Sequence, residues 1–446
     1  MCKSDFPRLL MRRLKASDAE HLGIFFERND RFEVTGFFKA FQLNMETAKK
    51  LLNPARKDQF FVMEGPDKFL AFSMLRGWDE GYDTPSFGIF VDWEYHGCGY
   101  GKRLCEWTFR WADQTGVPKV RLSVYEKNTH AINIYKKLGF IENARQYDKD
   151  KNANIIMHRT RQNIKTKVFT STQALIAYES LIDRLSYWYD AGIFCIEMSN
   201  YKVDNADEFL KTALLFPGAL LIHHFFPAER HNLVLNLASP SPSVRQETLL
   251  FFKRSIDWSE KIGSPFFSFH AGYISDPVDR NKYGFVFNTS AQKEAEAALN
   301  RFTSALKELA KYAAEHNIFL LVENNIVTKE NRDKLLLSKP DEFMNLFERL
   351  QETKNVGILL DWGHWLVTSN TYRLSLDSFK SLRERINGIH LHTNNGLADE
   401  HLPYSENDPC MNMIKKYNTK FISLEGKYPT IAVLQNSILK MEKILQ

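Results

Sequence analysis

The sequence has few cysteines and no long apolar run. Its five cysteines, in a chain of 446 residues, are scattered and show no CxxC spacing, so they form no disulfide framework. No stretch of about 18 consecutive apolar residues occurs, which argues against a transmembrane helix. The N-terminus, MCKSDFPRLLMRRLKASD, lacks the apolar core of a signal peptide. These absences predict a reduced, cytoplasmic protein that does not bind membranes.

A strong excess of one charge is also absent from most of the chain. Residues 1–165 contain 28 Lys and Arg against 21 Asp and Glu, whereas the remainder contains 31 against 33. Because phosphate neutralisation supplies most of the affinity of nucleic-acid-binding proteins, the C-terminal part is not expected to bind nucleic acid. The basic N-terminal part suits a small molecule that carries phosphate.

A glycine-rich turn stands between a predicted strand and a predicted helix in the N-terminal part. The strand covers residues 86–91, the glycines are Gly97, Gly99 and Gly101, and the amphipathic helix covers residues 102–115. Glycines allow close approach of the backbone, and N–H groups at the start of a helix bind anions. A dinucleotide-binding turn follows the first strand of a parallel unit, but this strand is at least the fourth. A plain tight turn is the alternative interpretation.

A second motif, VRLSVYEKNTHAINIYKKLGF, predicts a strand, a loop at Asn128 and a helix that carries Tyr135. With the glycine turn, it resembles the GNAT acetyltransferase family over residues 7–160. The resemblance implies that acetyl-CoA is the cofactor and that Tyr135 protonates the departing thiolate; a packed aromatic side chain is the alternative. The implied cofactor-binding residues are His96, Gly97, Gly99, Gly101, Lys102 and Asn128, with His96 where the family usually has Arg or Gln.

The acetyl acceptor is predicted only as an amine, with an amino sugar as one candidate. In this chemistry an amine attacks the thioester carbonyl, strand N–H groups hold the oxyanion, and a phenol supplies a proton. Glu33 and Asp92 are candidate general bases, and ordinary surface carboxylates are the alternative for both. The aromatic-rich residues 29–43 line the acceptor side or pack the core.

The C-terminal part begins without a Gly/Ser-rich or Pro-rich linker, and the predicted domains are residues 1–163 and residues 166–446. In the second domain, apolar runs alternate with helical patterns, which predicts strands at residues 168–170, 194–198, 219–223, 266–270, 318–323, 357–361, 388–392 and 421–425. Eight βα units in about 280 residues favour a (β/α)8 TIM barrel, whose active site lies at the C-terminal strand ends. The predicted fold is therefore α/β in two domains, an α+β acetyltransferase fold and a barrel.

Six consecutive strands of this predicted barrel end on residues that can bind metals. The residues at these ends are His223, His270, Glu323, Asp361, His364, His390, His392, Asp399, His401 and Glu425. A lone His is usually a core or surface group, and a strand-end Asp usually caps a helix. Six such ends together would leave buried carboxylates uncompensated unless they share a cation. A divalent metal site is therefore predicted, with Zn, Mn, Mg and Co as candidates. Glu197, at the second strand end, binds substrate hydroxyls or pairs in the core.

This order of residues resembles the xylose-isomerase-like TIM barrel superfamily, which includes sugar-phosphate isomerases and epimerases and the apurinic-endonuclease type. The resemblance implies a ligand set of Glu323, Asp361, His390 and Glu425. It also implies that Glu323 and Glu425 remove and return a substrate proton; ligation alone is the alternative. The extra ligands of the trinuclear zinc centre in the endonuclease branch match His223, His270, His364, Asp399 and His401. Glu400 departs from that branch, because it places a carboxylate where a DNA backbone would pass.

The leading hypothesis is a bifunctional enzyme of carbohydrate metabolism that acts on small molecules. It combines an acetyl-CoA-dependent N-acetyltransferase with a metal-dependent sugar or sugar-phosphate isomerase or epimerase. Two alternatives stay open for the barrel: a zinc-dependent apurinic-endonuclease-like enzyme, and a degenerate sugar-binding barrel that regulates the acetyltransferase. The sequence predicts neither the sugar nor the oligomeric state.

Overall fold

The computed structural model describes residues 9–148, 151–162, 167–175, 180–216, 218–228, 234–281, 284–287, 294–417 and 419–445. The chain divides into two compact units. The first contains residues 1–164, 186–194 and 430–436, and the second contains residues 165–185, 195–429 and 437–446. Each helix in the described ranges is too short or too polar to cross a membrane.

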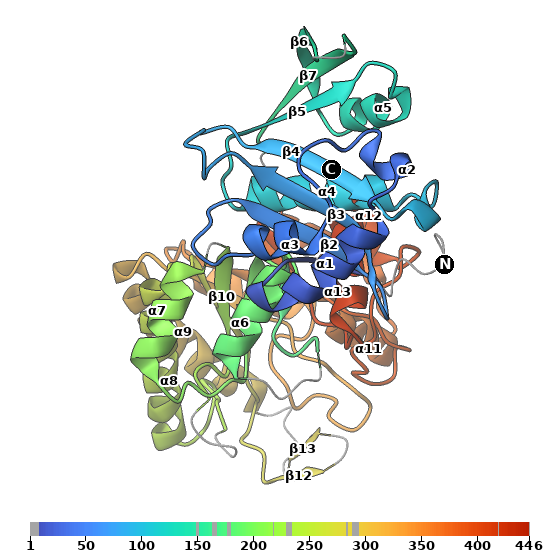
Figure 1. The fold of residues 1–446 in the computed structure, drawn as a ribbon. Helices are drawn as coiled ribbons and strands as arrows, with labels where there is room; N and C mark the ends of the chain where they lie inside the picture. Colours follow the sequence, from blue (N-terminus) through green and yellow to red (C-terminus); the bar gives the residue numbers. More distant parts are fainter. Residues whose placement is uncertain are drawn as a thin grey trace. The chain divides into compact units, whose positions relative to one another are not determined.

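The first unit is built on a mixed seven-stranded sheet of order β1-β2-β3-β4-β5-β7-β6 (Figure 1). Its strands are β1 (Leu10–Arg13), β2 (Gln59–Glu64), β3 (Phe69–Arg76), β4 (Ser86–Val91), β5 (Lys119–Tyr125), β6 (Ile141–Tyr147) and β7 (Ala153–Thr160). Its helices are α1 (Ala19–Arg28), α2 (Phe32–Thr35), α3 (Met45–Leu51), α4 (Tyr100–Gln114) and α5 (Thr129–Lys137), with short 3-10 turns η2 (Ala16–Asp18) and η3 (Trp93–Tyr95). Helix α4 begins two residues before its predicted start, because Gly99 caps it in a left-handed conformation with a φ of 86°.

Strands β4 and β5 diverge within this sheet. They run parallel and share one register pair, Ser86 with Arg121, whereas the other neighbouring strands pair antiparallel over longer stretches. Because hydrogen bonds do not continue along β4 and β5, the sheet opens toward their carboxyl ends. Of the aromatic residues 29–43, Phe38 is buried in the core, and Phe37 is half exposed and lines a cavity near this opening.

The second unit contains a closed barrel of eight parallel strands in the order β10-β11-β14-β15-β16-β17-β8-β9, as the sequence predicts. The strands are β8 (Lys167–Ser171), β9 (Cys195–Met198), β10 (Ala219–His223), β11 (Phe266–His270), β14 (Phe319–Glu323), β15 (Val356–Asp361), β16 (Ile386–Leu391) and β17 (Phe421–Leu424). A hairpin of β12 (Asp279–Asn281) and β13 (Gly284–Val286) follows β11. His392 and Glu425, predicted to end strands, each lie one residue beyond them.

Helices follow the barrel strands along the chain. They are α6 (Leu181–Asp190), α7 (Ala206–Leu215), α8 (Pro242–Lys261), α9 (Ala295–Glu315), α10 (Pro340–Arg349), α11 (Trp362–Tyr372), α12 (Cys410–Ile414) and α13 (Ile431–Leu445), with the 3-10 helix η5 (Leu376–Arg385). Helices α8 and α9 match predicted helices over residues 244–262 and 291–316, although residues 291–293 lie outside the described ranges. These two helices pack side by side (Figure 1).

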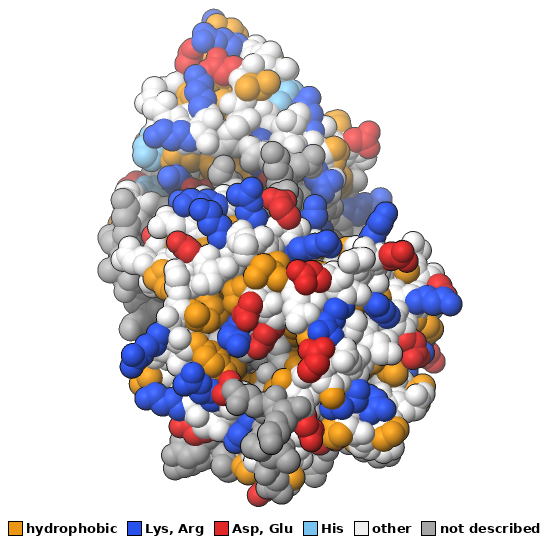
Figure 2. Space-filling model, turned by 180° about the vertical axis from the view of Figure 1, so that it is seen from behind, with side chains coloured by type: hydrophobic (Ala, Val, Ile, Leu, Met, Phe, Trp, Pro, Cys, Tyr) orange, Lys and Arg blue, Asp and Glu red, His pale blue; other side chains and the backbone are white. Residues whose placement is uncertain are grey.

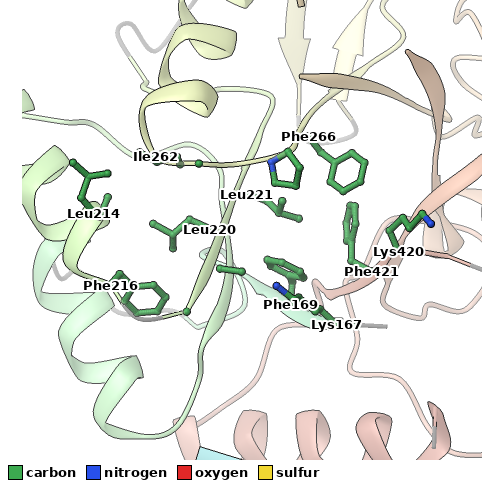
Figure 3. A pocket seen from close by; sticks show the side chains of 15 residues that line it. Lys167, Phe169, Leu214, Phe216, Leu220, Leu221, Ile262, Phe266, Lys420 and Phe421 are labelled. Carbon is green, nitrogen blue, oxygen red and sulfur yellow. The ribbon is translucent and has the colours of Figure 1, made fainter. Parts of the chain in front are cut away.

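The interior of the barrel changes from apolar to polar along six of its eight strands. One buried cluster near the strand starts contains Phe169, Cys195, Leu221, Leu321, Leu359 and Phe421. Side chains two residues apart on a strand point to the same side, and the residues two positions further on are Ser171, Glu197, His223, Glu323, Asp361 and Ser423, all buried. We call these the apolar layer and the polar layer. Phe169, Leu221 and Phe421 of the apolar layer, with neighbouring residues, line a cavity of about 480 Å³ at the N-terminal strand ends (Figure 3). The polar layer lies toward the opposite ends.

Candidate active sites

A cavity of about 740 Å³ occupies the opening between β4 and β5. Its lining comes from β4, the glycine turn, the start of α4, the loop before α5 and one face of α5, with α2 on another side. The residues predicted to bind the cofactor all line it: His96, Gly97, Gly99, Gly101, Lys102 and Asn128. Tyr135 lines it as well. The structure therefore brings the predicted acetyl-transfer residues together in one cavity.

The glycine turn has the conformation that its residues favour. Gly97 and Gly99 have φ angles of 79° and 86°, a region that side chains with a Cβ rarely adopt. At Gly101, a Cβ would lie 3.2 Å from Cγ2 of Val91, so a side chain here would crowd β4. The start of α4 lies at the cavity, because Tyr100, Gly101 and Lys102 line it, and the positive end of a helix dipole favours phosphate.

Three of the predicted cofactor-binding side chains already have local partners. The His96 ring has its Nε2 3.0 Å from the carbonyl oxygen of Val91, so the ring is directed toward the end of β4. Asn128 caps α5, because its side-chain oxygen accepts a hydrogen bond of 3.2 Å from the N–H of Ala131. Lys102 lies 3.8 Å from Glu106 on a half-exposed part of α4. These contacts leave the backbone of the turn as the main anion-binding element.

Tyr135 lies at the inner wall of the cavity on α5, and its side chain is buried. Its ring packs against Phe87 and Phe140, with centroids 6.1 Å and 5.9 Å away. Burial, and then the nearby thiol of Cys105, raise the pKa of the Tyr135 phenol well above its usual value. The phenol therefore stays protonated at neutral pH and can act as an acid. Cys105, which also lines the cavity, was not identified from the sequence, because a lone Cys in a helix gives no signal.

The two candidate general bases have different environments. Asp92 is fully buried and forms an ion pair with Arg28. It also accepts a hydrogen bond of 3.0 Å from the N–H of Glu94 as the cap of η3. Glu33 is exposed on α2 and lines the cavity. Asp92 thus stabilises the loop after β4, and Glu33 is the one of these two carboxylates that lines the cavity.

In the barrel, the predicted metal ligands meet at the C-terminal strand ends. We call Glu323, Asp361, His390 and Glu425 the central set. Nδ1 of His390 lies 3.2 Å from Oε1 of Glu323, 3.3 Å from Oε2 of Glu425 and 3.8 Å from Oδ2 of Asp361. One imidazole nitrogen therefore faces three carboxylates from three different strand ends. All four side chains are nearly or fully buried, with Glu425 the most exposed at 12% of its side chain.

A second set of donors shares Glu323 with the central set. Nε2 of His223 and Nδ1 of His270 lie 3.4 Å and 3.2 Å from Oε2 of Glu323. Because Oε1 of the same carboxylate faces His390, the two oxygens of Glu323 point to different groups of donors. Glu323 therefore belongs to two groups of side chains that could each hold a metal ion. Oε2 of Glu323 accepts no hydrogen bond from any described residue, which leaves it available as a ligand.

A third set contains His364, His392, Asp399 and His401. Nε2 of His401 and Nε2 of His364 lie 3.0 Å and 3.6 Å from Oδ2 of Asp399. Nε2 of His392 lies 3.1 Å from Oδ1 of Asp361 and 3.8 Å from Oδ1 of Asp399, which connects this set to the central set. His392 ended a predicted strand but was not among the expected ligands; the structure places its imidazole 4.1 Å from that of His401, ring to ring.

Most of these imidazoles use their other ring nitrogen to contact a fixed oxygen. Nδ1 of His223 lies 3.0 Å from Oγ of Ser268. Two rings contact backbone carbonyl oxygens: Nδ1 of His364 lies 2.9 Å from that of Asn324, and Nδ1 of His401 lies 3.2 Å from that of Glu425. Nε2 of His390 lies 2.8 Å from a carboxylate oxygen of Glu197. Each contact fixes the orientation of its ring and directs the opposite nitrogen toward the neighbouring carboxylates. Histidines that bind metals are oriented in this way. Ser268 was missed from the sequence, where it is one polar residue in an apolar run.

The charges at this site depend on one another. Burial raises the pKa of Glu323 to about 7, despite the opposing effect of His390. Burial disfavours the imidazolium of His364 and His390, but the facing carboxylates raise the pKa of both well above the usual value. His223 and His270 have lowered pKa values, mainly because they are buried. The isolated protein therefore holds protons among closely spaced carboxylates, which is a position that a divalent cation would take instead.

The donor chemistry and spacing fit a metal centre. Two ligands of one tetrahedral ion with bonds of about 2.1 Å lie about 3.4 Å apart. The contacts of Glu323 and Glu425 with the imidazoles of the first two sets span 3.2 to 3.4 Å. Carboxylate and imidazole donors suit zinc, manganese or cobalt. The residues that would hold the ions are the central set, the second set, and His364, Asp399 and His401 of the third.

Comparisons with known proteins match one family model to each of the two parts of the chain. The model of the xylose isomerase-like TIM barrel family matches residues 186–444, and that of the acetyltransferase (GNAT) family matches residues 25–140. The uncharacterized protein MJ1614 of Methanocaldococcus jannaschii is 28% identical over 198 residues, which are 43% of this chain and 67% of that protein. The uncharacterized protein MJ1311 of the same organism is 28% identical over 211 residues, or 46% of this chain and 66% of that protein.

Solved structures resemble each unit separately. A D-tagatose 3-epimerase-like protein is 22% identical and covers 63% of this chain and 98% of its own, with a TM-score of 0.48. A GNAT acetyltransferase from Streptococcus pneumoniae is 20% identical and covers 34% of this chain and 99% of its own, with a TM-score of 0.31. The barrel family model matches more than half of the sequence. The chain therefore belongs to the xylose isomerase-like TIM barrel family and carries, ahead of the barrel, a domain of the GNAT acetyltransferase family.

Proposed function

We propose that this protein is a bifunctional enzyme, an acetyl-CoA-dependent N-acetyltransferase joined to a metal-dependent sugar or sugar-phosphate isomerase or epimerase. The observation that supports the barrel activity is the central set, in which Glu323, Asp361 and Glu425 surround one nitrogen of His390 at 3.2 to 3.8 Å. The observation that supports acetyl transfer is the cavity between β4 and β5, which the glycine turn and Tyr135 line together.

In the acetyltransferase domain, acetyl-CoA supplies an acetyl group as a thioester. The N–H groups after Gly97 and Gly99 would hold its pyrophosphate at the start of α4. Glu33, on the exposed side of the cavity, accepts a proton from the acceptor ammonium so that a neutral amine attacks the thioester carbonyl. The phenol of Tyr135 gives a proton to the departing sulfur. The acceptor is an amine small enough to approach past α2.

In the barrel, a divalent cation would polarise the carbonyl or alkoxide oxygens of a sugar. Glu323 ends β14 and Glu425 follows β17, three strands further around the ring of eight. These carboxylates therefore approach the cation position from different directions. One removes a proton from the carbon next to the carbonyl, and the other returns a proton to the same or the neighbouring carbon.

A second candidate function is hydrolysis of a phosphoester, and the donors outside the central set favour it. An enzyme that uses one ion leaves His223, His270, Asp399 and His401 without a catalytic purpose, whereas two or three neighbouring ions stabilise both oxygens of a phosphoryl displacement. Against a nucleic-acid substrate, Glu400 stands beside Asp399 at the mouth of the site. On the face drawn in Figure 2, Lys and Arg side chains are interspersed with Asp and Glu side chains.

Metal content and isotope exchange distinguish these two candidates. For an isomerase or epimerase, we expect one ion per chain to be essential, and deuterium from heavy water to enter a ketose or aldose beside its carbonyl. Elemental mass spectrometry of the purified chain and NMR of a sugar and sugar-phosphate panel measure both. Two or three zinc ions, with cleavage of a phosphodiester or of abasic-site DNA and no exchange, would establish hydrolysis instead. A chain that takes up no ion after supplementation would contradict both.

Metal binding is expected to release protons at neutral pH. Asp399 raises the pKa of His401 to about 9 against the effect of burial, and the pKa of His364 and His390 is also raised. These imidazoles are therefore protonated at pH 7 in the metal-free protein, and each must lose its proton to become a ligand. Apparent zinc affinity should rise by about tenfold per pH unit for each proton displaced between pH 6 and 9. Calorimetry in buffers of different ionisation enthalpy counts the protons; a count of zero would be incompatible with the proposed ligands.

A further inference from the structure

His392 lies among the donors of the third set, although the resemblance to the barrel family did not imply it as a ligand. It follows β16 by one residue, and its side chain is fully buried. Nε2 of His392 lies 3.1 Å and 3.2 Å from the two oxygens of Asp361, and 3.8 Å from Oδ1 of Asp399. One imidazole nitrogen therefore faces two carboxylates that come from different parts of the chain.

His364 contacts the same two carboxylates and completes a ring of four donors. Its Nε2 lies 3.9 Å from Oδ2 of Asp361 and 3.6 Å from Oδ2 of Asp399. Imidazole and carboxylate therefore alternate around the ring, and the ligand atoms of Asp361, His364 and His392 all lie within 4.8 Å of one another. Two ligands of one tetrahedral ion lie about 3.4 Å apart, so the spacing around this ring suits four ligands of a single cation.

Packing holds the His392 ring in this place. Its Nδ1 is buried and has no hydrogen-bond partner among the residues that the structure describes. The ring stacks on that of His401, with the two planes 16° apart, and it lies against Gly363 in the first turn of α11. A Cβ at residue 363 would overlap Nδ1, Cε1 and Nε2 of the ring. Because a close-packed interior leaves the ring no free space to move into, a side chain at residue 363 would push it away from the carboxylates.

We infer that His392 is a further ligand of the cation position in the third set, together with Asp361, His364 and Asp399, and that Gly363 is a positioning residue that admits its ring. This inference rests on the proposed metal centre. An ion in this ring would share Asp361 with the central set, whereas His392 belongs to the third set alone. Loss of His392 should therefore remove the third ion and leave the ion of the central set in place.

The test counts zinc ions in the full-length protein by elemental mass spectrometry, after loading with zinc and removal of the excess. The variants are His392→Ala, Gly363→Ala and the double variant. We expect each to hold one ion per chain fewer than the wild type, His392→Ala because a donor is missing and Gly363→Ala because the new methyl group displaces the ring. His316→Ala is the control and should keep the wild-type count, because His316 follows α9 directly before β14, at the opposite end of the barrel.

The double variant separates a ligand from a packing residue. The methyl group of Ala at residue 363 would enter the space that the ring leaves, so a defect of packing alone should be relieved and the third ion should return. If His392 is a ligand, the ion stays absent. The zinc that remains in the central set, together with thermal unfolding, shows that each variant is folded. His392→Asn, which keeps a polar side chain in the same space, replaces the alanine variant if that one unfolds, and the same loss is expected.

The outcomes that contradict the inference differ from those that contradict the metal function. A wild-type zinc count in His392→Ala, or a restored count in the double variant, would overturn the ligand assignment while the metal centre stands. A wild-type count in Gly363→Ala would overturn the positioning role of Gly363. If the wild type itself takes up no zinc, the proposed metal function fails, and this inference fails with it.

Discussion

Replacing Glu323 with glutamine should remove more metal from this protein than any other single substitution in the barrel. Its Oε1 faces His390 in the central set, and its Oε2 faces His223 and His270 in the second set. The amide can present one oxygen but no negative charge, so two neighbouring cation positions lose a ligand together. We expect at least one ion per chain fewer by elemental mass spectrometry and a fall in barrel activity of about 10³-fold or more.

The same substitution should leave the metal-free protein as stable as the wild type or more stable, and should make the zinc-loaded protein less stable than the zinc-loaded wild type. Without metal, Glu323→Gln removes a buried carboxyl group whose pKa burial raises, so the variant should unfold at the same temperature as the wild type or higher. With zinc at a hundredfold excess over its dissociation constant, the wild type gains about 2.7 kcal/mol that the variant lacks. Thermal unfolding with and without zinc measures both. Glu330→Gln, an exposed residue further along the loop after β14, is the control. Equal metal content in Glu323→Gln and the wild type would refute the bridging geometry.

Replacing Tyr135 with phenylalanine should lower kcat of acetyl transfer by about 10²-fold with little change in KM. The ring would keep its contacts with Phe87 and Phe140, so the fold and the cavity should remain, and the loss would report the missing proton. Release of free thiol from acetyl-CoA, with a panel of polyamines and amino sugars as acceptors, provides the assay.

Tyr95→Phe is the matched control for this second experiment. Tyr95 lines the same cavity, but it lies beside the glycine turn, where its ring stacks on Tyr100 at 5.9 Å. Its hydroxyl has no role in the proposed proton transfer, so kcat should stay close to that of the wild type. If Tyr135→Phe also retained full kcat, the phenol would be a packing residue, which is the other interpretation that the sequence allowed.

The barrel was predictable because its signals are local. Each strand is an apolar run of a few residues, and the predicted donors directly follow these runs. The apolar runs therefore indicated the strands, and the residues after them indicated the end of the barrel at which the donors meet. The parts that were not predictable depend on side-chain direction across strands. The sequence did not show that the two oxygens of Glu323 face different donor sets, or that Glu197 lies 2.8 Å from His390. These contacts join residues far apart along the chain, and only the closed ring brings them together.

In the acetyltransferase domain, too, local sequence patterns were predictable, and contacts between residues far apart in the sequence were not. The glycine turn was predicted because left-handed glycines before a helix have a recognisable pattern. The directions in which the His96 and Asp92 side chains point were not predicted, because both directions depend on the conformation of the loop after β4. That loop turns the His96 ring toward Val91 and places the Asp92 carboxylate against Arg28. A pattern of residue types is equally consistent with a phosphate contact and with a structural ion pair.

The two layers inside the barrel have a consequence for how this protein can diverge over time. In six strands, the residue that packs the fold and the residue that faces the metal-binding end are two positions apart. A substitution in the polar layer can therefore delete one donor while the phenylalanines and leucines below it stay packed. Under the proposed function, descendants of this barrel could therefore lose or acquire ions one at a time, and so exchange one reaction for another, while the apolar layer keeps the fold.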